Sequence, residues 1–535
     1  MLLKKRRLVE QFRQQWGRDP NESPVAYMTR NRLEEIRLYY QEYGKKDIDD
    51  ITWSDLDMDE VFFRINHTRC FAGEQFLYLK LHEINSNKDL DTFEKLVSLF
   101  YQDEEGRLNY EYKLSGIGKV FGSYYLPVSL KMISFHEPTS IFLYRVLQIL
   151  FVSSALGLIV LQSHPCAYLL VAVILVNLII YIVKKSQQEN MFYSLYNICA
   201  ILRFCRFVEK NWPLKEGPFL HQLQKDLKVL KMTERTAGSF ALKKAAAYND
   251  PQNLLADYIW GVTLVDLVAY EKILRELSKN EEAVLRLFNL TGMIDTAISC
   301  ASFRKSIMHW CVPSALQEDK IHCKSVFHPL IKDAIPNDIE LNKTTIITGA
   351  NASGKSTFMK AIAVNVILAQ TINTCTAMGF GFPPMGVISS MAVRDDVVSG
   401  ESFYIREVKY MKRMISQIEQ GQPMLLIIDE IMKGTNQKES LAISQAILHY
   451  FVDKKCFVVV ATHEDILVGK LKQDYQCYYF DCRYRDKQLL FDFKIRPGFG
   501  GETNAVKLLK QFDYPDIILN ETMLILGEED DYENK

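Results

Sequence analysis

The chain has 535 residues, and 48% of them are hydrophobic, which is enough for a sizeable core and excludes a largely disordered chain. This length exceeds what one core usually organises, so we expect roughly two to four domains. Because 64 Lys and Arg balance 65 Asp and Glu to a net charge of -1, a whole-chain attraction to nucleic acid or anionic lipid is excluded. The 11 cysteines have no paired C-x-x-C spacing, which predicts reduced cytosolic thiols.

The N-terminal region, residues 1–135, carries apolar residues at helical spacing in stretches such as 31–43 and 91–101. This pattern predicts a mostly helical region. The chain begins Met-Leu-Leu-Lys-Lys-Arg-Arg, and Glu10 follows soon after, so it lacks the apolar core of a secretion signal. The basic cluster 4–7 is interpreted either as a contact for DNA or acidic lipid or as a solvated helix face.

Two uncharged apolar runs, 146–161 and 166–183, lie in the next segment, 136–185. Each is near the length that crosses a bilayer, and the turn between them is short, so we expect a two-helix transmembrane hairpin. Lys and Arg flank the pair and are missing from the turn. The positive-inside rule then predicts a multi-pass protein of the cell membrane with its N- and C-terminal regions in the cytoplasm. The alternative is a pair of buried helices in a soluble core.

The pattern changes twice after this pair. Residues 186–320 return to helical spacing, which predicts a helical core or lever region. In 321–520, strand-like apolar runs alternate with helices, the rhythm of an α/β nucleotide-binding sheet, and 521–535 form an acidic tail. The strand-like runs are 344–348, 424–428 and 456–461. The predicted fold class is therefore an α/β P-loop NTPase domain, C-terminal to a mostly α-helical core that a transmembrane hairpin interrupts.

The most informative motif, G-A-N-A-S-G-K-S-T, follows the first of these strand-like runs and precedes a helix-like one. The spacing G-x-x-x-x-G-K-S lets backbone N–H groups surround phosphates, points Lys355 at the β- and γ-oxygens, and places the Ser356 hydroxyl on Mg²⁺. The context favours a P-loop for ATP and Mg²⁺ over a chance match. The expected nucleotide-binding residues of this loop are Gly349, Asn351, Ser353, Gly354, Lys355, Ser356 and Thr357.

Two further strand-like runs end in polar residues. Asp429 ends the run M-L-L-I-I-D and is expected to hold the metal together with Ser356, while Glu430 would orient or deprotonate the hydrolytic water. His463 follows V-V-V-A-T and is expected near the γ-phosphate, because ligands of open α/β sheets bind beyond the carboxyl ends of the strands. The alternatives are a structural carboxylate pair and a capping or core histidine. We expect an ATP hydrolase in which Glu430, Lys355 and His463 act in catalysis.

These residues resemble the MutS family of DNA mismatch-repair ATPases. The P-loop segment is similar to that family's T-G-P-N-M-G-G-K-S-T, and residues 395–402, D-D-V-V-S-G-E-S, are similar to its D-D-x-x-S-G-x-S loop. Residues 429–431 with 434–435 resemble its D-E-I-x-x-G-T, and 461–463 match its A-T-H. The chain is thus identified as a short, membrane-anchored MutS-like member.

The resemblance implies a composite site. Two ATPase domains would pair in a homodimer, and Ser402 of one subunit would reach the γ-phosphate held by the other. It also implies mismatched or branched DNA as a partner, with the membrane contacted through 146–183. The implied function is a dimeric ATPase that couples ATP binding and hydrolysis to conformational change, with DNA binding related to mismatch repair or recombination.

The sequence leaves two other functions open. One is a membrane-bound, ATP-driven switch or remodeller that no longer binds mismatched DNA, which the neutral net charge favours. The MutS family also inserts a Phe-x-Glu wedge into DNA, and we identify no counterpart of that wedge. The other is the ATPase partner of a transporter, although the L-S-G-G-Q signature of such ATPases is missing from the sequence.

Overall fold

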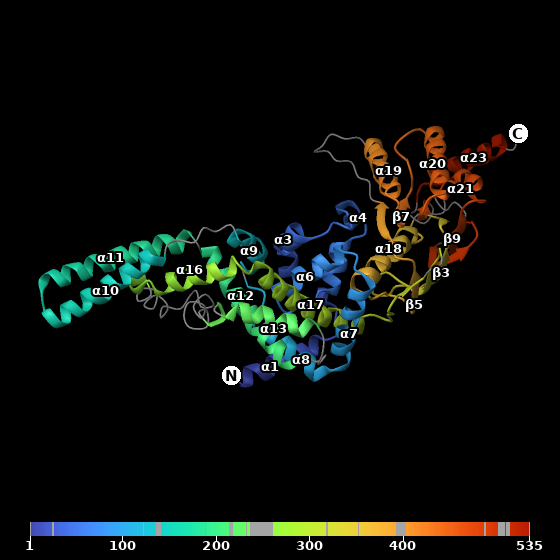
Figure 1. The fold of residues 1–535 in the computed structure, drawn as a ribbon. Coiled ribbons are helices and arrows are strands. Elements are labelled where there is room, and N and C mark those ends of the chain that lie inside the picture. Colours follow the sequence, from blue (N-terminus) through green and yellow to red (C-terminus); the bar gives the residue numbers. More distant parts are fainter. Residues whose placement is uncertain are drawn as a thin grey trace. The chain divides into compact units, whose positions relative to one another are not determined.

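The computed structural model of the chain forms two compact units, which are drawn together in Figure 1. Unit 1 contains Met1–Gly44, Asn66–Leu79 and Lys95–Ser302, and unit 2 contains Lys45–Ile65, Lys80–Glu94 and Phe303–Lys535. The structure describes all residues except 1, 24–25, 121, 135–140, 188, 213–217, 232, 236–260, 317–318, 351, 392–402, 486–487, 501–508, 510–513 and 534–535.

Unit 1 is built from helices over its described residues. Three of them, α6, α7 and α17, continue into residues that belong to unit 2. The helices are α1 (Leu2–Gln15), η1 (Pro20–Glu22), α2 (Ala26–Asn31), α3 (Leu33–Tyr43), α6 (Phe71–His82), α7 (Asn87–Gln102), α8 (Glu104–Ser115), η2 (Ser123–Tyr125), α9 (Leu126–Ser134), α10 (Ile141–Leu161), α11 (His164–Gln187), α12 (Glu189–Asn211), α13 (Pro218–Val229), α16 (Val265–Leu277) and α17 (Glu281–Ser306).

Buried carboxylates organise the polar interior of unit 1. Glu74 accepts hydrogen bonds from Lys119 Nζ at 2.6 Å and Asn66 Nδ2 at 3.0 Å, and the Tyr124 hydroxyl also donates to it. Asp295 accepts from the backbone N–H of Cys70 at 2.9 Å, near the start of α6. Burial raises the pKa of Asp295 to about 6, since desolvation disfavours the charged form.

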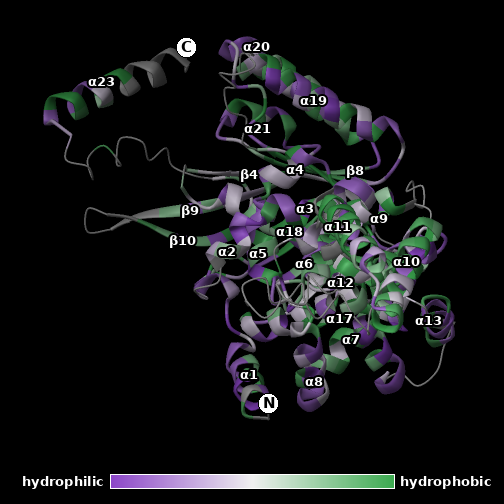
Figure 2. Cartoon of the chain, turned by 90° about the vertical axis from the view of Figure 1, so that its left-hand side faces the viewer, coloured by the Kyte–Doolittle hydropathy of each residue, from purple (hydrophilic) through white to green (hydrophobic). Residues whose placement is uncertain are grey.

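Helices α10 and α11 lie side by side in unit 1 (Figure 1). Residues Ile141–Leu161 and His164–Lys184 have mean hydropathies of 1.9 and 2.8, yet only 11% and 17% of these stretches are buried. Apolar side chains such as Ile159 and Ile179 therefore point outward, and Figure 2 colours much of α10 and α11 as hydrophobic. Both helices are long and apolar enough to cross a membrane.

The described residues of unit 2 form an α/β structure with two sheets. The larger sheet has the strand order β10-β9-β4-β8-β7-β6. All neighbouring strands in it are parallel except β9 and β10, which are antiparallel to each other. Its strands are β4 (Thr344–Gly349), β6 (Gly386–Ser390), β7 (Met424–Asp429), β8 (Cys456–Ala461), β9 (Gln476–Arg485) and β10 (Gln488–Pro497). The smaller sheet, in the order β1-β5-β2-β3, contains β1 (Ser314–Ala315), β2 (Ile321–Val326), β3 (Asn337–Leu341) and β5 (Gly379–Phe382).

The three apolar runs that predict strands form β4, β7 and β8 in the centre of the larger sheet. Both faces of β7 are covered, since Leu425 and Ile427 are as fully buried as their neighbours Leu426 and Ile428, as is typical of parallel strands between helix layers. The helices of unit 2 are α4 (Asp50–Asp55), α5 (Met58–Ile65), α18 (Lys355–Ile372), α19 (Phe403–Glu419), α20 (Gln437–Val452), α21 (Asp465–Leu471) and α23 (Asp516–Glu533).

Helix α4 protects the edge strand β6, although 334 residues of sequence separate their bonded side chains. The Asp55 carboxylate accepts hydrogen bonds from Ser389 Oγ at 2.7 Å and Met391 N at 3.0 Å. Thr52 Oγ1 accepts from Ser389 N at 3.1 Å. Backbone groups of an uncovered edge strand can pair with another chain. By accepting hydrogen bonds from these backbone N–H groups, α4 blocks such pairing at this edge.

Candidate functional site

The loop between β4 and α18 bends sharply through two glycines. Gly349 and Gly354 have φ of +135° and +103°, a region that side-chain-bearing residues rarely adopt. A Cβ on Gly349 would also lie only 2.7 Å from the carbonyl oxygen of Phe480. Conformation and space therefore both require glycine at this position.

Lys355, the first residue of α18, folds back onto this loop. Its Nζ donates to the carbonyl oxygens of Gly349 at 2.6 Å and Ala350 at 3.0 Å, and the side chain is buried. Burial lowers the pKa of Lys355, while the nearby Asp429 carboxylate acts in the opposite direction. The loop thus holds a desolvated ammonium group that can exchange its carbonyl partners for other oxygen acceptors.

The start of α18 has the features of an anion site. Its N-cap residue, Gly354, forms no side-chain capping hydrogen bond, so the first backbone N–H groups of the helix keep free donors. Ser353 is buried, and its Oγ has no hydrogen-bond partner among the described residues. Free N–H groups and the positive end of the helix dipole together favour a bound phosphate or carboxylate.

Glu430 lies just beyond β7 and is held by several groups. Its backbone N–H donates to the Ala461 carbonyl at the end of β8 at 3.0 Å, with φ at Glu430 of +62°. His463 Nδ1 lies 3.0 Å from its Oε1, and Lys433 forms an ion pair with its Oε2. The neighbouring strands β7 and β8 thereby place a carboxylate and an imidazole next to each other.

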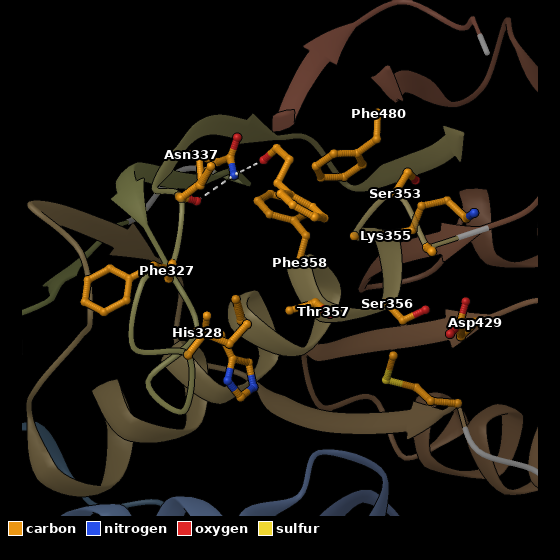
Figure 3. Close-up of a pocket in the computed structure, with 18 of the residues that line it drawn as sticks. Phe327, His328, Asn337, Ser353, Lys355, Ser356, Thr357, Phe358, Asp429 and Phe480 are labelled. Carbon is orange, nitrogen blue, oxygen red and sulfur yellow. Dashed lines mark hydrogen bonds between the residues drawn. The ribbon is translucent and has the colours of Figure 1, made fainter. Parts of the chain in front are cut away.

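A cavity of about 560 Å³ joins these groups. Ser356 and Asp429 lie on one side of it, and Phe358 and Phe480 form an aromatic wall in which their ring centroids are 5.7 Å apart (Figure 3). Phe493 of β10 also lines the cavity, and its ring lies next to Gly354. The cavity therefore has a polar part and a flat apolar part, which suits a ligand with phosphates and an aromatic ring.

The structure brings most of the predicted site residues to this cavity. Those that line it are Ser353, Gly354, Lys355, Ser356, Thr357, Asp429 and Glu430. Gly349 contacts the cavity indirectly through Lys355, and His463 through Glu430. Asn351, Ser402 and the whole of the loop 395–402 lie outside the described residues.

Sequence reasoning missed three parts of the site. Glu407 of α19 lines the cavity and accepts hydrogen bonds from the backbone N–H of Lys433 at 3.0 Å and Gly434 at 2.9 Å, which fixes the turn after Glu430. Asn337 of β3 contacts β10, because its Nδ2 donates to the Phe493 carbonyl at 3.0 Å. This contact lies next to an irregularity in the pairing of β9 and β10. The aromatic wall was the third. These contacts cross more than 25 residues of sequence and follow no local spacing.

Comparison with known proteins places these observations in a family context. Residues 345–528 match the family model of MutS domain V, and the match begins within β4. The DNA mismatch repair protein MutS of Thermotoga maritima is 25% identical over 267 residues, which is 48% of this chain and 33% of that protein. The MutS proteins of Streptococcus sanguinis and Pseudothermotoga lettingae are 26% and 28% identical, over 48% and 36% of this chain and 32% and 25% of their own lengths. The chain spans at most about a third of these relatives.

Proposed function

We propose, from the match to MutS domain V and the similarity to MutS proteins, that this chain is a MutS-family member whose unit 2 binds ATP with Mg²⁺ and hydrolyses it. One observation carries the proposal: a single cavity combines the free N–H donors at the start of α18 with the Lys355 ammonium and the carboxylates of Asp429 and Glu430. Phosphate binding, metal binding and water activation need these three kinds of group.

Each residue has a proposed part in that reaction. The loop N–H groups from Gly349 to Thr357, with Asn351, would surround the phosphates, and Lys355 would exchange its two carbonyl partners for phosphate oxygens. Ser356 and Asp429 would hold Mg²⁺, which supplies charge neutralisation between the β- and γ-phosphates. The aromatic wall would take the base of the nucleotide.

The hydrolytic step would depend on Glu430. Its carboxylate would orient the attacking water and accept its proton, and His463 would hold that carboxylate in position. Ser402 would complete the site from the second subunit of a homodimer, so that hydrolysis would require the two domains to close.

Helices α10 and α11 are proposed to anchor the chain in the cell membrane as a multi-pass pair, with both flanks cytoplasmic. Their polar side chains support this assignment: Asn177 Nδ2 donates to the Val262 carbonyl at 2.6 Å, and Gln148 Nε2 to the Thr263 carbonyl at 2.8 Å. A polar group within lipid needs such a protein partner. The outward side chains are apolar and mostly unburied, unlike those of a soluble core helix.

The proposed function is therefore a membrane-anchored, dimeric ATPase that couples ATP binding and hydrolysis to conformational change, with DNA binding related to mismatch repair or recombination. The second candidate is a membrane-bound, ATP-driven switch that no longer binds mismatched DNA. The net charge of -1 favours the second candidate, because DNA binding rests largely on neutralising phosphates with Lys and Arg.

The ATPase is tested with the detergent-solubilised full chain. We expect Mg²⁺-dependent hydrolysis, and we expect Lys355→Ala to lose both ATP binding and turnover. Lys360→Ala is the matched control, because Lys360 lies on the same helix and pairs with Asp57 at 2.6 Å. If the folded wild-type protein hydrolyses no ATP with or without DNA, the assignment is wrong.

A DNA titration separates the two candidate functions. Homoduplex, mismatched and branched DNA would be added at several salt concentrations, with and without ATP. Salt-sensitive binding that ATP modulates at physiological ionic strength supports the DNA-linked function. Failure to bind any of the three DNAs supports the switch.

The membrane assignment is tested in intact cells. We expect Ser163→Cys, in the turn between α10 and α11, to react with a thiol reagent that cannot cross the membrane. Labelling only after the cells are permeabilised would contradict the proposed topology.

A further inference from the structure

Cys311 and Cys375 are direct partners in an isolated antiparallel bridge of unit 2. The Cys311 N–H donates to the Cys375 carbonyl at 3.1 Å, and the Cys375 N–H donates to the Cys311 carbonyl at 3.0 Å. Residues paired in this way point their side chains to the same face, with Cα atoms about 5.5 Å apart. This separation lies within the range that a disulfide spans, about 4.4–6.8 Å.

The two thiols differ in their surroundings. Cys311 is half-buried, whereas Cys375 is fully buried. A hydrogen bond from the Cys375 thiol lowers the pKa of Cys311, and the Phe380 N–H and the Arg304 charge act in the same direction against burial. Burial raises the pKa of Cys375. Cys311 therefore forms a thiolate more readily than Cys375 and is more accessible to solvent.

Neighbouring contacts hold this pair in place. Arg304 donates to the Asn373 carbonyl at 2.9 Å and to Thr374 Oγ1 at 3.0 Å, directly before Cys375. The same guanidinium pairs with both carboxylate oxygens of Glu94, at 2.7 and 2.6 Å. The fixed cation both positions the backbone of Cys375 and supplies positive charge near the thiols.

A third thiol, that of Cys323, is near this pair but is arranged differently. Cys323 lies on β2, where its backbone is opposite Phe380 of β5 and Ile339 of β3. It is fully buried, and burial raises the pKa of its thiol. The register therefore pairs Cys311 with Cys375 and leaves Cys323 as a natural internal control.

We propose that Cys311 and Cys375 form a reversible, redox-sensitive disulfide in which Cys311 reacts first. With hydrogen peroxide as oxidant, the Cys311 thiolate attacks one peroxide oxygen, the O–O bond breaks, and a sulfenic acid and one water form after proton transfer. The Cys375 sulfur then attacks the Cys311 sulfur, the S–O bond breaks, and a second water leaves. Two thiols thus lose two electrons to the peroxide, and a small-molecule thiol reverses the reaction by exchange.

The disulfide would form near the C-terminal end of α18, whereas the loop between β4 and α18 lies at the other end of this helix. Cys375 follows the C-terminus of α18 by three residues, and Cys311 follows the C-terminus of α17 by five. A disulfide here would covalently join the segments after these two helices. We expect a higher midpoint of thermal unfolding for the oxidised chain, because a cross-link restricts the unfolded state. This inference does not depend on ATP binding.

The test treats the reduced full chain in detergent with one equivalent of hydrogen peroxide. The remaining thiols are blocked with N-ethylmaleimide, and the non-reduced digest is analysed by mass spectrometry. We expect a peptide pair that links Cys311 to Cys375 and disappears with dithiothreitol. A link from Cys311 to Cys323, or a Cys311 that stays a free thiol under these conditions, would overturn the proposal.

Variants assign the order of reaction. With Cys375→Ser, we expect the Cys311 sulfenic acid to persist and to be trapped by dimedone, whereas Cys323→Ser should leave the Cys311–Cys375 link intact. Since a buried substitution can impair folding, the wild type gives an independent measure. Its Cys311 should react with iodoacetamide at least about tenfold faster than Cys375, and equal rates would contradict the assignment.

Discussion

Helix α11 and strand β7 are both uncharged apolar runs, yet their surroundings are opposite. All residues of β7 before Asp429 are buried, under helices on both faces of the sheet. In α11 only 17% of the most apolar stretch is buried. The contrast shows that hydrophobicity alone does not define a core: the strand is covered by protein, and the helix needs another apolar environment, for which the bilayer is our proposal.

The polar ends of the two runs differ as well. Strand β7 ends in Asp429 and Glu430 at a cavity, where charge can take part in chemistry. Helix α11 continues into Lys184 and Lys185, which are suited to the surface of a membrane. The same kind of apolar run thus leads to the carboxylates of the proposed catalytic site in one unit and forms the proposed membrane anchor in the other.

The largest expected effect is at the end of β7. Replacing Glu430 by Gln removes the proposed base and keeps the shape, so we expect kcat for ATP to fall by about 10²- to 10⁴-fold while ATP binding persists. Steady-state hydrolysis and a nucleotide-binding assay measure the two quantities. Glu419→Gln, at the exposed end of α19, is the control. Wild-type turnover in Glu430→Gln would remove this residue from the proposed mechanism.

The next effect compares the two runs directly. Leu426→Ala in β7 creates a cavity in a closed core, and we expect a loss of about 2–5 kcal/mol in the free energy of unfolding. Leu175→Ala in α11 shortens a side chain that is 56% exposed, so we expect a loss below about 1 kcal/mol. Pulse proteolysis in detergent can compare both variants. Equal losses would mean that protein, and not lipid, covers this face of α11.

A third effect concerns pH. Burial lowers the pKa of His328, beside the cavity, to about 4. The folded pKa lies below the unfolded value of about 6.5, so its contribution to stability is present above pH 6.5 and is lost as pH falls toward 4. A shift of this size corresponds to about 3 kcal/mol. We expect His328→Gln to flatten this part of the curve of unfolding free energy against pH.

Asp295 in unit 1 is the matched case of opposite sign. Its folded pKa of about 6 lies above the unfolded value of about 3.9. Its contribution to stability is therefore present below pH 4 and is lost as pH rises through 6. Hydrogen exchange gives the unfolding free energy of each unit separately. Plotted against pH in this range, the two free energies should have slopes of opposite sign, and slopes of the same sign would contradict both assignments.

The smallest effect tests the polar contact within the apolar pair. Asn177→Leu removes the hydrogen bond to the Val262 carbonyl, and we expect a loss of about 0.5–2 kcal/mol in stability in detergent. Asn177→Gln can restore a donor and is the control. No change in either variant would mean that this contact does not hold Val262 against α11.

Sequence patterns predicted the parts of this molecule that depend on neighbours along the chain. The apolar runs predicted β4, β7 and β8, which the structure contains. The apolar helices extend beyond the predicted 146–161 and 166–183, to Ile141–Leu161 and His164–Gln187, because polar residues at helix ends can continue a helix after the apolar pattern stops.

Features that depend on distant contacts were not predictable. Asp55 contacts β6 because its carboxylate matches free donors at a sheet edge, and no local spacing encodes such a match. Phe493 reaches the cavity through an irregularity in β10, where φ is +52°. In the sequence, nothing distinguishes Glu407 from other glutamates on helices. Its role depends on the distant turn at Lys433 and Gly434, whose backbone N–H groups donate to its carboxylate.

The bond between Asp55 and Ser389 has a consequence for biosynthesis. A ribosome adds about 5–20 residues per second, so the 334 residues between these partners take about 20–70 s to make. Helix α4 leaves the ribosome that long before the strand it covers. Until then the strand edge does not exist, and afterwards it can pair with another chain only while α4 has not yet docked on it. Because α4 is synthesised first, it is available to protect β6 as soon as this edge strand is made.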